Sequence, residues 1–242
     1  MTTNEQNGYL ILEHLSDIEL YYNPSGMIKN GEIILDGEEF HHAVNVMRNS
    51  SGDILFITDG LGKLFKTKIT QVKKSLLTCI IEEKTDYQNP AKNIWFCIPV
   101  LKNPDRLKFA LEKCVELGIT NFILFTSKYS VSKKINIDKY QKTLLSAMKQ
   151  SLRTFLPGIS SANFNEIINF QGRIILFDQK SQLEFDCKLK EENKTYFLFG
   201  PEGGFDNSEI NSVSHESVFN LSSSRLRSET AIIKCASILS FI

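Results

Sequence analysis

The stretch that decides the fold is Phe197-Leu-Phe-Gly-Pro-Glu-Gly-Gly-Phe205, in which an apolar run meets three glycines within five residues. The apolar residues 196–199 predict a short, fully buried strand. Asp206 and Glu209 have the spacing of a capping box, which predicts a helix start directly after the loop. A buried strand, a glycine-rich loop and a helix N-terminus are typical of ligand sites at the carboxyl end of a strand in an α/β sheet.

The loop between this strand and this helix differs from the common nucleotide-binding loops. No Gly-Lys-Ser/Thr follows it, and its glycines do not have the Gly-x-Gly-x-x-Gly spacing. Its glycines permit positive φ and allow a ligand to approach the main chain closely. The local pattern alone leaves a second interpretation open, namely a tight strand-to-helix turn that binds nothing.

Composition and charge narrow the class of protein. The chain has 242 residues, enough for one large domain or two modest ones. Lys plus Arg and Asp plus Glu both number 28, so a nucleic-acid surface would have to be a local patch. No apolar run approaches the ~18 residues of a membrane span, and the N-terminus lacks the basic start of a signal peptide. We therefore expect a cytoplasmic protein that does not cross a membrane.

The cysteines indicate a reducing compartment rather than disulfides or a metal. They are odd in number, far apart and mostly inside apolar runs: Cys79, Cys97, Cys114, Cys187 and Cys235. This pattern predicts reduced, buried thiols. No Cys-x-x-Cys or paired His/Cys spacing occurs, so we expect no metal site.

The first third of the chain predicts a small β-rich domain. Residues 1–17 are left unassigned as an N-terminal extension, and residues 18–84 hold closely spaced short strands and one helix. The strands are expected at 32–36, 53–58, 64–72 and 76–82, and the helix at 38–47. This arrangement suggests a small barrel. The polar, proline-containing residues 85–92 predict a linker.

Residues 93–242 instead alternate strands and helices, which predicts an α/β domain with a mainly parallel sheet. Buried strands are expected at 94–100, 122–125, 174–177, 196–199 and 218–221. Asn103-Pro104 predicts the start of one helix, and Asp138 with Gln141 predicts another as a capping box. The last helix is expected to start near Ser228 or Glu229 and to be buried, because it is apolar almost all round.

A second unusual loop follows the last expected strand: Leu221-Ser-Ser-Ser-Arg-Leu-Arg-Ser-Glu-Thr-Ala231. It is again a strand end, a small polar loop and a helix N-terminus with an acidic residue in its first turn. Both loops are expected at the carboxyl ends of strands, so they could form one pocket together.

The two loops together resemble the SPOUT class of RNA methyltransferases, and more narrowly the RsmE family, which makes 3-methyluridine in 16S ribosomal RNA. Three further segments, 40–60, 102–118 and 147–157, are also similar to this family, so the resemblance covers the chain from about residue 19 onward. The family's second loop usually begins Leu-Gly, where this chain has Leu221-Ser222. The common form also has an arginine where Ser224 stands and an aliphatic residue where Arg225 stands, and Arg225 could substitute from the next position.

The resemblance implies a fold, a cofactor and a partner. The fold would be a mostly parallel α/β sheet with a deep trefoil knot, preceded by a PUA-like RNA-binding barrel, and the enzyme would be a homodimer. The cofactor would be S-adenosylmethionine (SAM), which carries no phosphate and needs no P-loop lysine. The residues implied around it are Phe199, Gly200, Glu202, Gly203, Gly204, Leu221, Ser222, Leu226 and Ser228. Core packing is an equally good interpretation of Leu221 and Leu226.

The implied reaction needs charged side chains. Uridine N3 keeps its proton at neutral pH, so the protein must position the base and stabilise negative charge as the proton leaves. Arg227 or Arg225 could stabilise that charge. Glu229 is either the proton acceptor or the partner that orients Arg227, and its simplest alternative role is to interact with the helix dipole.

RNA binding would depend on local charge. Five lysines and no acidic residue lie between Gly60 and Ile81. The residues expected to bind RNA are His42, Arg48, Lys63, Lys66, Lys68, Arg106 and Arg153. A solvated face is the alternative interpretation of such a lysine run. Two other functions also remain open at this stage: methylation of tRNA or large-subunit rRNA, and a non-catalytic role in RNA binding or ribosome assembly.

Overall fold

The computed structural model describes residues 18–24, 28–29, 31–130, 135–186 and 193–240, so the expected extension at 1–17 lies outside the described residues. The chain divides into two compact units. The first contains the chain up to Asn89 together with Met148–Leu156, and the second contains Pro90–Ala147 and the chain from Pro157 onward. The division falls within the stretch expected to be a linker, although a strand runs on to Asp86.

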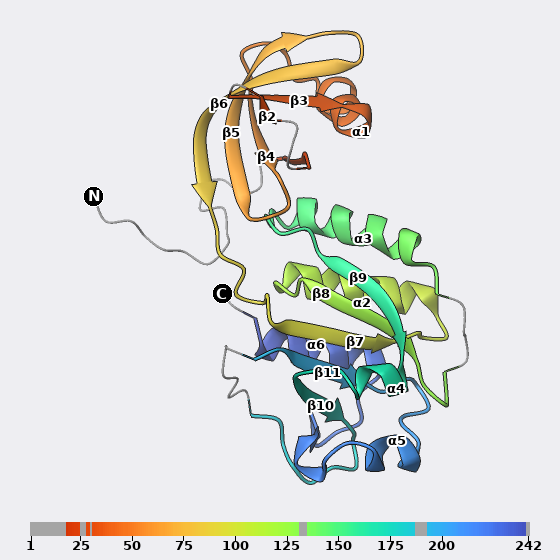
Figure 1. Ribbon diagram of the computed structural model, residues 1–242. Coiled ribbons are helices and arrows are strands. Elements are labelled where there is room, and N and C mark those ends of the chain that lie inside the picture. The colour runs from red at the N-terminus through yellow and green to blue at the C-terminus, as the bar shows by residue number, and fades with distance from the viewer. Residues whose placement is uncertain (1–17, 25–27, 30, 131–134, 187–192, 241–242) are drawn as a thin grey trace. The chain divides into compact units, whose positions relative to one another are not determined.

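The first unit is built on a six-stranded sheet that curls into a half-barrel (Figure 1). The strands are β1 (Leu20–Tyr22), β2 (Ile28–Lys29), β3 (Glu32–Asp36), β4 (Ile54–Thr58), β5 (Lys63–Val72) and β6 (Leu76–Asp86). Their order is β1-β4-β5-β6-β3-β2, and no pairing in the described part joins β1 to β2. The expected small barrel is therefore corrected to an open half-barrel. The β5–β6 pair has two register shifts, and such irregularities in a ladder bend and curl a sheet.

The helix expected at 38–47 consists of two consecutive helical segments of different type. Residues Gly37–Phe40 form α1, and His41–Val46 continue as the π-helix η2. Arg48 then takes a left-handed backbone conformation with φ 60°. The side chain of Asn49 donates to the carbonyl of Ala43 at 3.1 Å and to the hydroxyl of Tyr21 at 3.2 Å, which fixes this end of the helix on the sheet.

The segment Met148–Leu156 belongs to the first unit, although it comes much later in the chain. The amide of Gly62 donates to the carbonyl of Thr154 at 3.1 Å, and the amide of Leu156 donates to the carbonyl of Gly60 at 2.8 Å. Gly62 lies so close to Phe155 that an added Cβ would be 2.5 Å from its ring. The sequence did not predict this insertion.

The second unit contains a six-stranded sheet in which every pairing is parallel, as predicted. The strands are β7 (Ile94–Pro99), β8 (Asn121–Thr126), β9 (Gly158–Asn163), β10 (Arg173–Phe177), β11 (Thr195–Phe199) and β12 (Val218–Phe219). Their order is β12-β10-β11-β7-β8-β9. All five residues of β11 are buried, which confirms the predicted buried strand. Strand β9 was not predicted, because this polar edge strand has little hydrophobic signal.

The helices of the second unit are α2 (Pro104–Glu116), α3 (Ile137–Gln150, its last turn in the first unit), α4 (Phe164–Ile167), α5 (Asn207–Asn211), η3 (His215–Ser217) and α6 (Ser228–Ile238). The caps predicted at Asn103 and Asp206 are confirmed, and α6 begins at Ser228 as expected. The cap predicted at Asp138 is wrong, because Asn136 Oδ1 accepts from the amide of Lys139 at 3.1 Å. Helix α6 packs against α2 and β11 (Figure 1).

Candidate active site

The glycine-rich loop after β11 folds back on itself. Gly204 has φ +74°, a conformation that suits glycine. A Cβ at Gly200 would lie 3.4 Å from the Cα of Gly204, and a Cβ at Gly203 would lie 3.1 Å from the Cβ of Tyr129. The loop therefore needs small residues where its own backbone and the loop after β8 approach it.

Polar contacts hold this loop in one conformation. The Asp206 carboxylate accepts from the hydroxyl of Tyr129 at 2.7 Å and is 3.0 Å from the Lys128 ammonium. The buried carboxylate of Glu209 accepts from the amides of Lys128 and Asp206, both at 2.9 Å. Hydrogen bonds from Ser208 and then from Tyr129 hold the pKa of Asp206 well below its ordinary value. The loops after β8 and β11 are thus fixed to each other.

The second loop, residues 221–227, leads directly into α6 and is joined to the first. The Ser228 hydroxyl donates to the carbonyl of Gly200 at 2.8 Å, so one hydrogen bond links the two loops. Within the second loop, the hydroxyls of Ser222 and Ser224 are 3.1 Å apart. The expectation that the two loops form one pocket is confirmed, because both line a single cavity of about 740 Å³.

This cavity, called here the loop cavity, brings together all the residues expected around the cofactor. They are Phe199, Gly200, Glu202, Gly203, Gly204, Leu221, Ser222, Leu226 and Ser228. Its volume is in the range of small-molecule sites, which is roughly 300–1,000 Å³. The sequence did not predict one wall of the loop cavity. This wall consists of the residues directly after β10, namely Asp178, Gln179 and Lys180. The signal was present, because polar residues follow a buried strand at the carboxyl edge of the same sheet.

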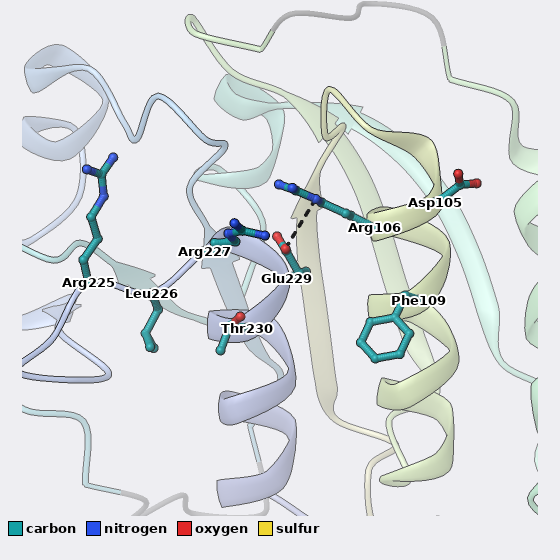
Figure 2. A pocket seen from close by; sticks show the side chains of 8 residues that line it. All are labelled: Asp105, Arg106, Phe109, Arg225, Leu226, Arg227, Glu229 and Thr230. Atoms are coloured by element: carbon teal, nitrogen blue, oxygen red, sulfur yellow. Dashed lines mark ion pairs between the residues drawn. The ribbon is translucent and has the colours of Figure 1, made fainter.

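A second cavity of about 640 Å³ adjoins the loop cavity and lies at the N-terminal turns of α2 and α6 (Figure 2). The two cavities share Arg106, Arg225, Leu226 and Arg227. Glu229 lines only the second one. The three residues expected to be catalytic, Arg225, Arg227 and Glu229, therefore all line this second cavity.

The ion pair of Glu229 was not foreseen. Its Oε1 is 3.6 Å from Nε of Arg106, and its side chain is 12% exposed. Its Oε2 is buried and has no hydrogen-bond partner among the residues that the structure describes. Arg106 was expected to bind RNA. The structure places it beside Glu229, where it lines both cavities.

The lysines expected to bind RNA lie on β5, next to an acidic strand. Register places Lys63 opposite Asp86 and Lys66 opposite Glu83, whereas Lys68 faces Ile80. Lys66 Nζ is 2.6 Å from Glu83 Oε1, and this contact raises the pKa of Lys66. The lysine run therefore has acidic neighbours that its own sequence stretch does not show.

The other residues expected to bind RNA, His42, Arg48 and Arg153, also belong to the first unit. His42 is half-buried, with its ring 5.8 Å from that of Tyr21, and Arg48 is exposed. Arg153 lies in the inserted segment of the first unit.

Two expected absences concern metals and membranes. Within the described ranges there is no cluster of three or more His, Cys, Asp or Glu side chains that could hold a metal ion. Nor does that part of the chain contain a helix long and apolar enough to cross a membrane.

The cysteines that lie in the described part of the chain agree with the expectation of buried thiols. Cys79, Cys97, Cys114 and Cys235 are buried and form no disulfide among the described residues, and burial raises the pKa of Cys79 to about 11. Cys187 lies outside the described residues.

Comparisons with known proteins agree with this arrangement. Residues 88–240 match a family model described as an RNA methyltransferase domain, and residues 35–82 match an RNA methyltransferase PUA domain. The ribosomal RNA small subunit methyltransferase E of Bacillus subtilis is 26% identical over 227 residues, which cover 86% of this chain and 89% of that protein. The corresponding protein of Aquifex aeolicus is 28% identical over 216 residues, 86% of this chain and 93% of that protein.

Solved structures show the same fold. The crystal structure of a ribosomal RNA small subunit methyltransferase E from Neisseria gonorrhoeae, bound to SAM, aligns with a TM-score of 0.80 at 22% identity. The alignment covers 92% of this chain and 96% of that one. Because the first family model spans more than half of the sequence, the chain belongs to the RNA methyltransferase domain family, and its resemblance to the RsmE family is confirmed.

Proposed function

We propose that the protein transfers a methyl group from SAM to N3 of a uridine in 16S rRNA of the small ribosomal subunit. The observation that carries this proposal is the pair of adjoining cavities. One is enclosed by the two loops that Ser228 links, and the other contains Arg227 and Glu229. The names of the Bacillus and Aquifex relatives support small-subunit rRNA as the substrate.

The residues of the loop cavity fit SAM. Its inner wall is apolar, since the rings of Phe177 and Phe199 stack with their centroids 5.2 Å apart. Glycine and serine backbone groups around it can hydrogen-bond an adenine. Asp178 and Glu202 also line the cavity, and their carboxylates can attract the sulfonium and ammonium groups that SAM carries. Glu202 is held in place by the amide of Lys102, which donates to its Oε1 at 3.0 Å.

The side chains beside the loop cavity supply what the acceptor needs. Bound SAM provides a methyl carbon activated by the positive sulfur. Arg227 stabilises negative charge on a uracil carbonyl oxygen, and Arg225 adds to the positive potential of the same cavity. Glu229 receives the N3 proton, and Arg106 holds that carboxylate in position. Helices α2 and α6 fix these groups relative to the loops, which is the orientation effect that the reaction requires.

We further propose the architecture that the family resemblance implies. Residues 18–84 form the domain that binds RNA, and residues 93–242 form the domain that carries the methyltransferase site. Residues 85–92 are the linker between these two domains. A trefoil knot is supported by the return of α6 from the edge strand β12 to the central strand β11 and α2. A homodimer is supported by Ile238, an apolar side chain on α6 that is 38% exposed. The enzyme would act in the cytoplasm, where small subunits are assembled.

Nucleoside mass spectrometry tests the reaction. Small subunits lacking the methyl group are incubated with purified protein and SAM, with naked 16S rRNA alongside. New 3-methyluridine on the subunits is expected. Methylation of a different RNA would show that the enzyme has another substrate. Absence of SAM binding by calorimetry would indicate a non-catalytic RNA-binding or assembly factor instead.

A further inference from the structure

The second cavity is placed where an acceptor base must lie. It shares four lining residues with the loop cavity, so a group bound there borders the space that holds the cofactor. Its walls come from the first two turns of α2, the first turn of α6 and the loop residues directly before α6. These helices pack against each other, so the groups of both walls are fixed relative to one another.

The polar groups of this cavity have a definite order. In Figure 2 the guanidinium ends of Arg106 and Arg227 both point toward the carboxylate of Glu229. A guanidinium only donates hydrogen bonds, and an ionised carboxylate only accepts them. The edge presented to a ligand therefore reads donor, acceptor, donor.

The carboxylate between the two arginines is incompletely paired. The contact from Arg106 Nε to Glu229 Oε1 is 3.6 Å, which is longer than a good hydrogen bond. Glu229 Oε2 is buried without a hydrogen-bond partner in the part of the chain that the structure describes. A ligand therefore reaches the carboxylate at Oε1 rather than at the buried Oε2, and an N–H brought there gains affinity because the 3.6 Å contact leaves Oε1 weakly paired.

The imide edge of uracil has the complementary order, a carbonyl, an N3–H and a second carbonyl. Cytosine does not, because its N3 is an acceptor and its exocyclic amine is a donor. We propose that the second cavity binds the acceptor uracil by this edge, with Glu229 accepting from N3–H and Arg106 and Arg227 donating to the carbonyls. Glu229 thereby selects uracil over cytosine. This inference rests on the proposed function and specifies its substrate site.

An aromatic ring is also available to the base. Phe109 lines the cavity one turn beyond Arg106 on α2 and is 48% exposed (Figure 2). Aromatic side chains commonly stack on bases that have left their helix, and stacking does not depend on base identity. Phe109 therefore adds affinity, whereas Glu229 adds selectivity.

The assignment also explains where the N3 proton of the uracil goes during methyl transfer. As the N3–methyl bond forms and the sulfur–methyl bond breaks, the electron pair of the N3–H bond stays on nitrogen and its proton moves to the Glu229 carboxylate. The sulfonium becomes a neutral thioether. The Glu229 carboxyl group then releases the proton to water, so no further reactant is needed.

The first test is the pH profile of Glu229→Gln. At about pH 7 we expect its turnover on small subunits to fall about 100-fold or more, with SAM affinity unchanged, because its amide cannot take the proton. Its rate should then rise by up to about tenfold per pH unit toward pH ~9, as uridine itself ionises, while the unmodified enzyme changes little. Glu112→Gln is the matched control, because Glu112 is an acidic residue on α2 that lines neither cavity, and it should behave as the unmodified enzyme. Equal turnover and pH profiles in Glu229→Gln and the unmodified enzyme would overturn the assignment.

The second test is binding, which does not need the proposed reaction. With SAM present, hexauridylate should bind about tenfold or more tightly than hexacytidylate, since the wrong base leaves a buried carboxylate unpaired. Glu229→Gln should abolish this preference. No preference in the unmodified protein, or a preference that survives the substitution, would refute the uracil site. Loss of the preference in the variant together with no 3-methyluridine on subunits would instead refute only the proposed rRNA substrate.

Discussion

The hydrogen bond from Ser228 to Gly200 is the direct link between the two loops, and Ser228→Ala removes it. The bond is 2.8 Å long and half-buried, so the Gly200 carbonyl regains only part of its hydrogen bonding from water. A neutral hydrogen bond of this kind contributes about 1 kcal/mol net. If the bond serves to hold the loops in their binding conformation, the Kd for SAM should rise about fivefold. The melting temperature should fall by about 2–4 °C.

Isothermal titration calorimetry with SAM and differential scanning calorimetry of the free protein measure the two effects. Ser237→Ala is the matched control, since Ser237 is an exposed serine on the same helix, α6. It should change neither quantity appreciably. A lower melting temperature with an unchanged Kd for SAM would refute the reasoning, because the bond would then stabilise the fold without organising the loops.

Three further predictions concern charged groups. Arg227→Ala should bind SAM nearly normally but lose most turnover, measured by calorimetry and by methyl transfer to small subunits. Asp206→Asn should lower the melting temperature near neutral pH. Because the pKa of Asp206 is depressed below its ordinary 3.8 in the folded state, the difference from the unmodified protein should stay constant down to about pH 5 and narrow below about pH 4. Lys68→Glu should weaken RNA binding in filter assays more than Lys66→Glu, since Lys66 is already paired with Glu83.

Each of these predictions has a contradicting result. Equal losses of SAM affinity and rate in Arg227→Ala would leave that residue a binding role only. A melting difference for Asp206→Asn that is unchanged at acid pH would show that the charge of Asp206 does not matter. Unaltered RNA affinity in Lys68→Glu and Lys66→Glu, with SAM affinity as the control, would place the RNA surface elsewhere.

The structural features that the sequence predicted best are those that depend on residues close together in the chain. The caps at Asn103 and Asp206 and the buried strand before Gly200 follow from local propensity and patterning, and they are confirmed. Strand β9 escaped prediction because its side chains are largely polar and exposed. The barrel expected from the sequence is a half-barrel in the structure, because closure depends on which strands end beside each other and no local pattern determines that.

The site shows the same limit. Both loops were found because glycines and serines follow buried strands. The ion pair between Arg106 and Glu229 was not found, because helix packing brings these residues together across more than a hundred positions of chain. Likewise, the acids opposite Lys63 and Lys66 follow from the register of β5 and β6, which the lysine stretch alone does not determine.

The inserted segment Met148–Leu156 has a consequence for synthesis on the ribosome. All six strands of the first unit have been translated once Asn89 is made, yet the Thr154 carbonyl that pairs with Gly62 does not exist at that stage. Domains generally fold as units in the order in which they emerge. Here the earlier unit has to wait for residues that are encoded within the later one. A nascent chain that ends at Asn89 is therefore an incomplete domain, and cutting the gene at that boundary separates a fold from one of its own parts.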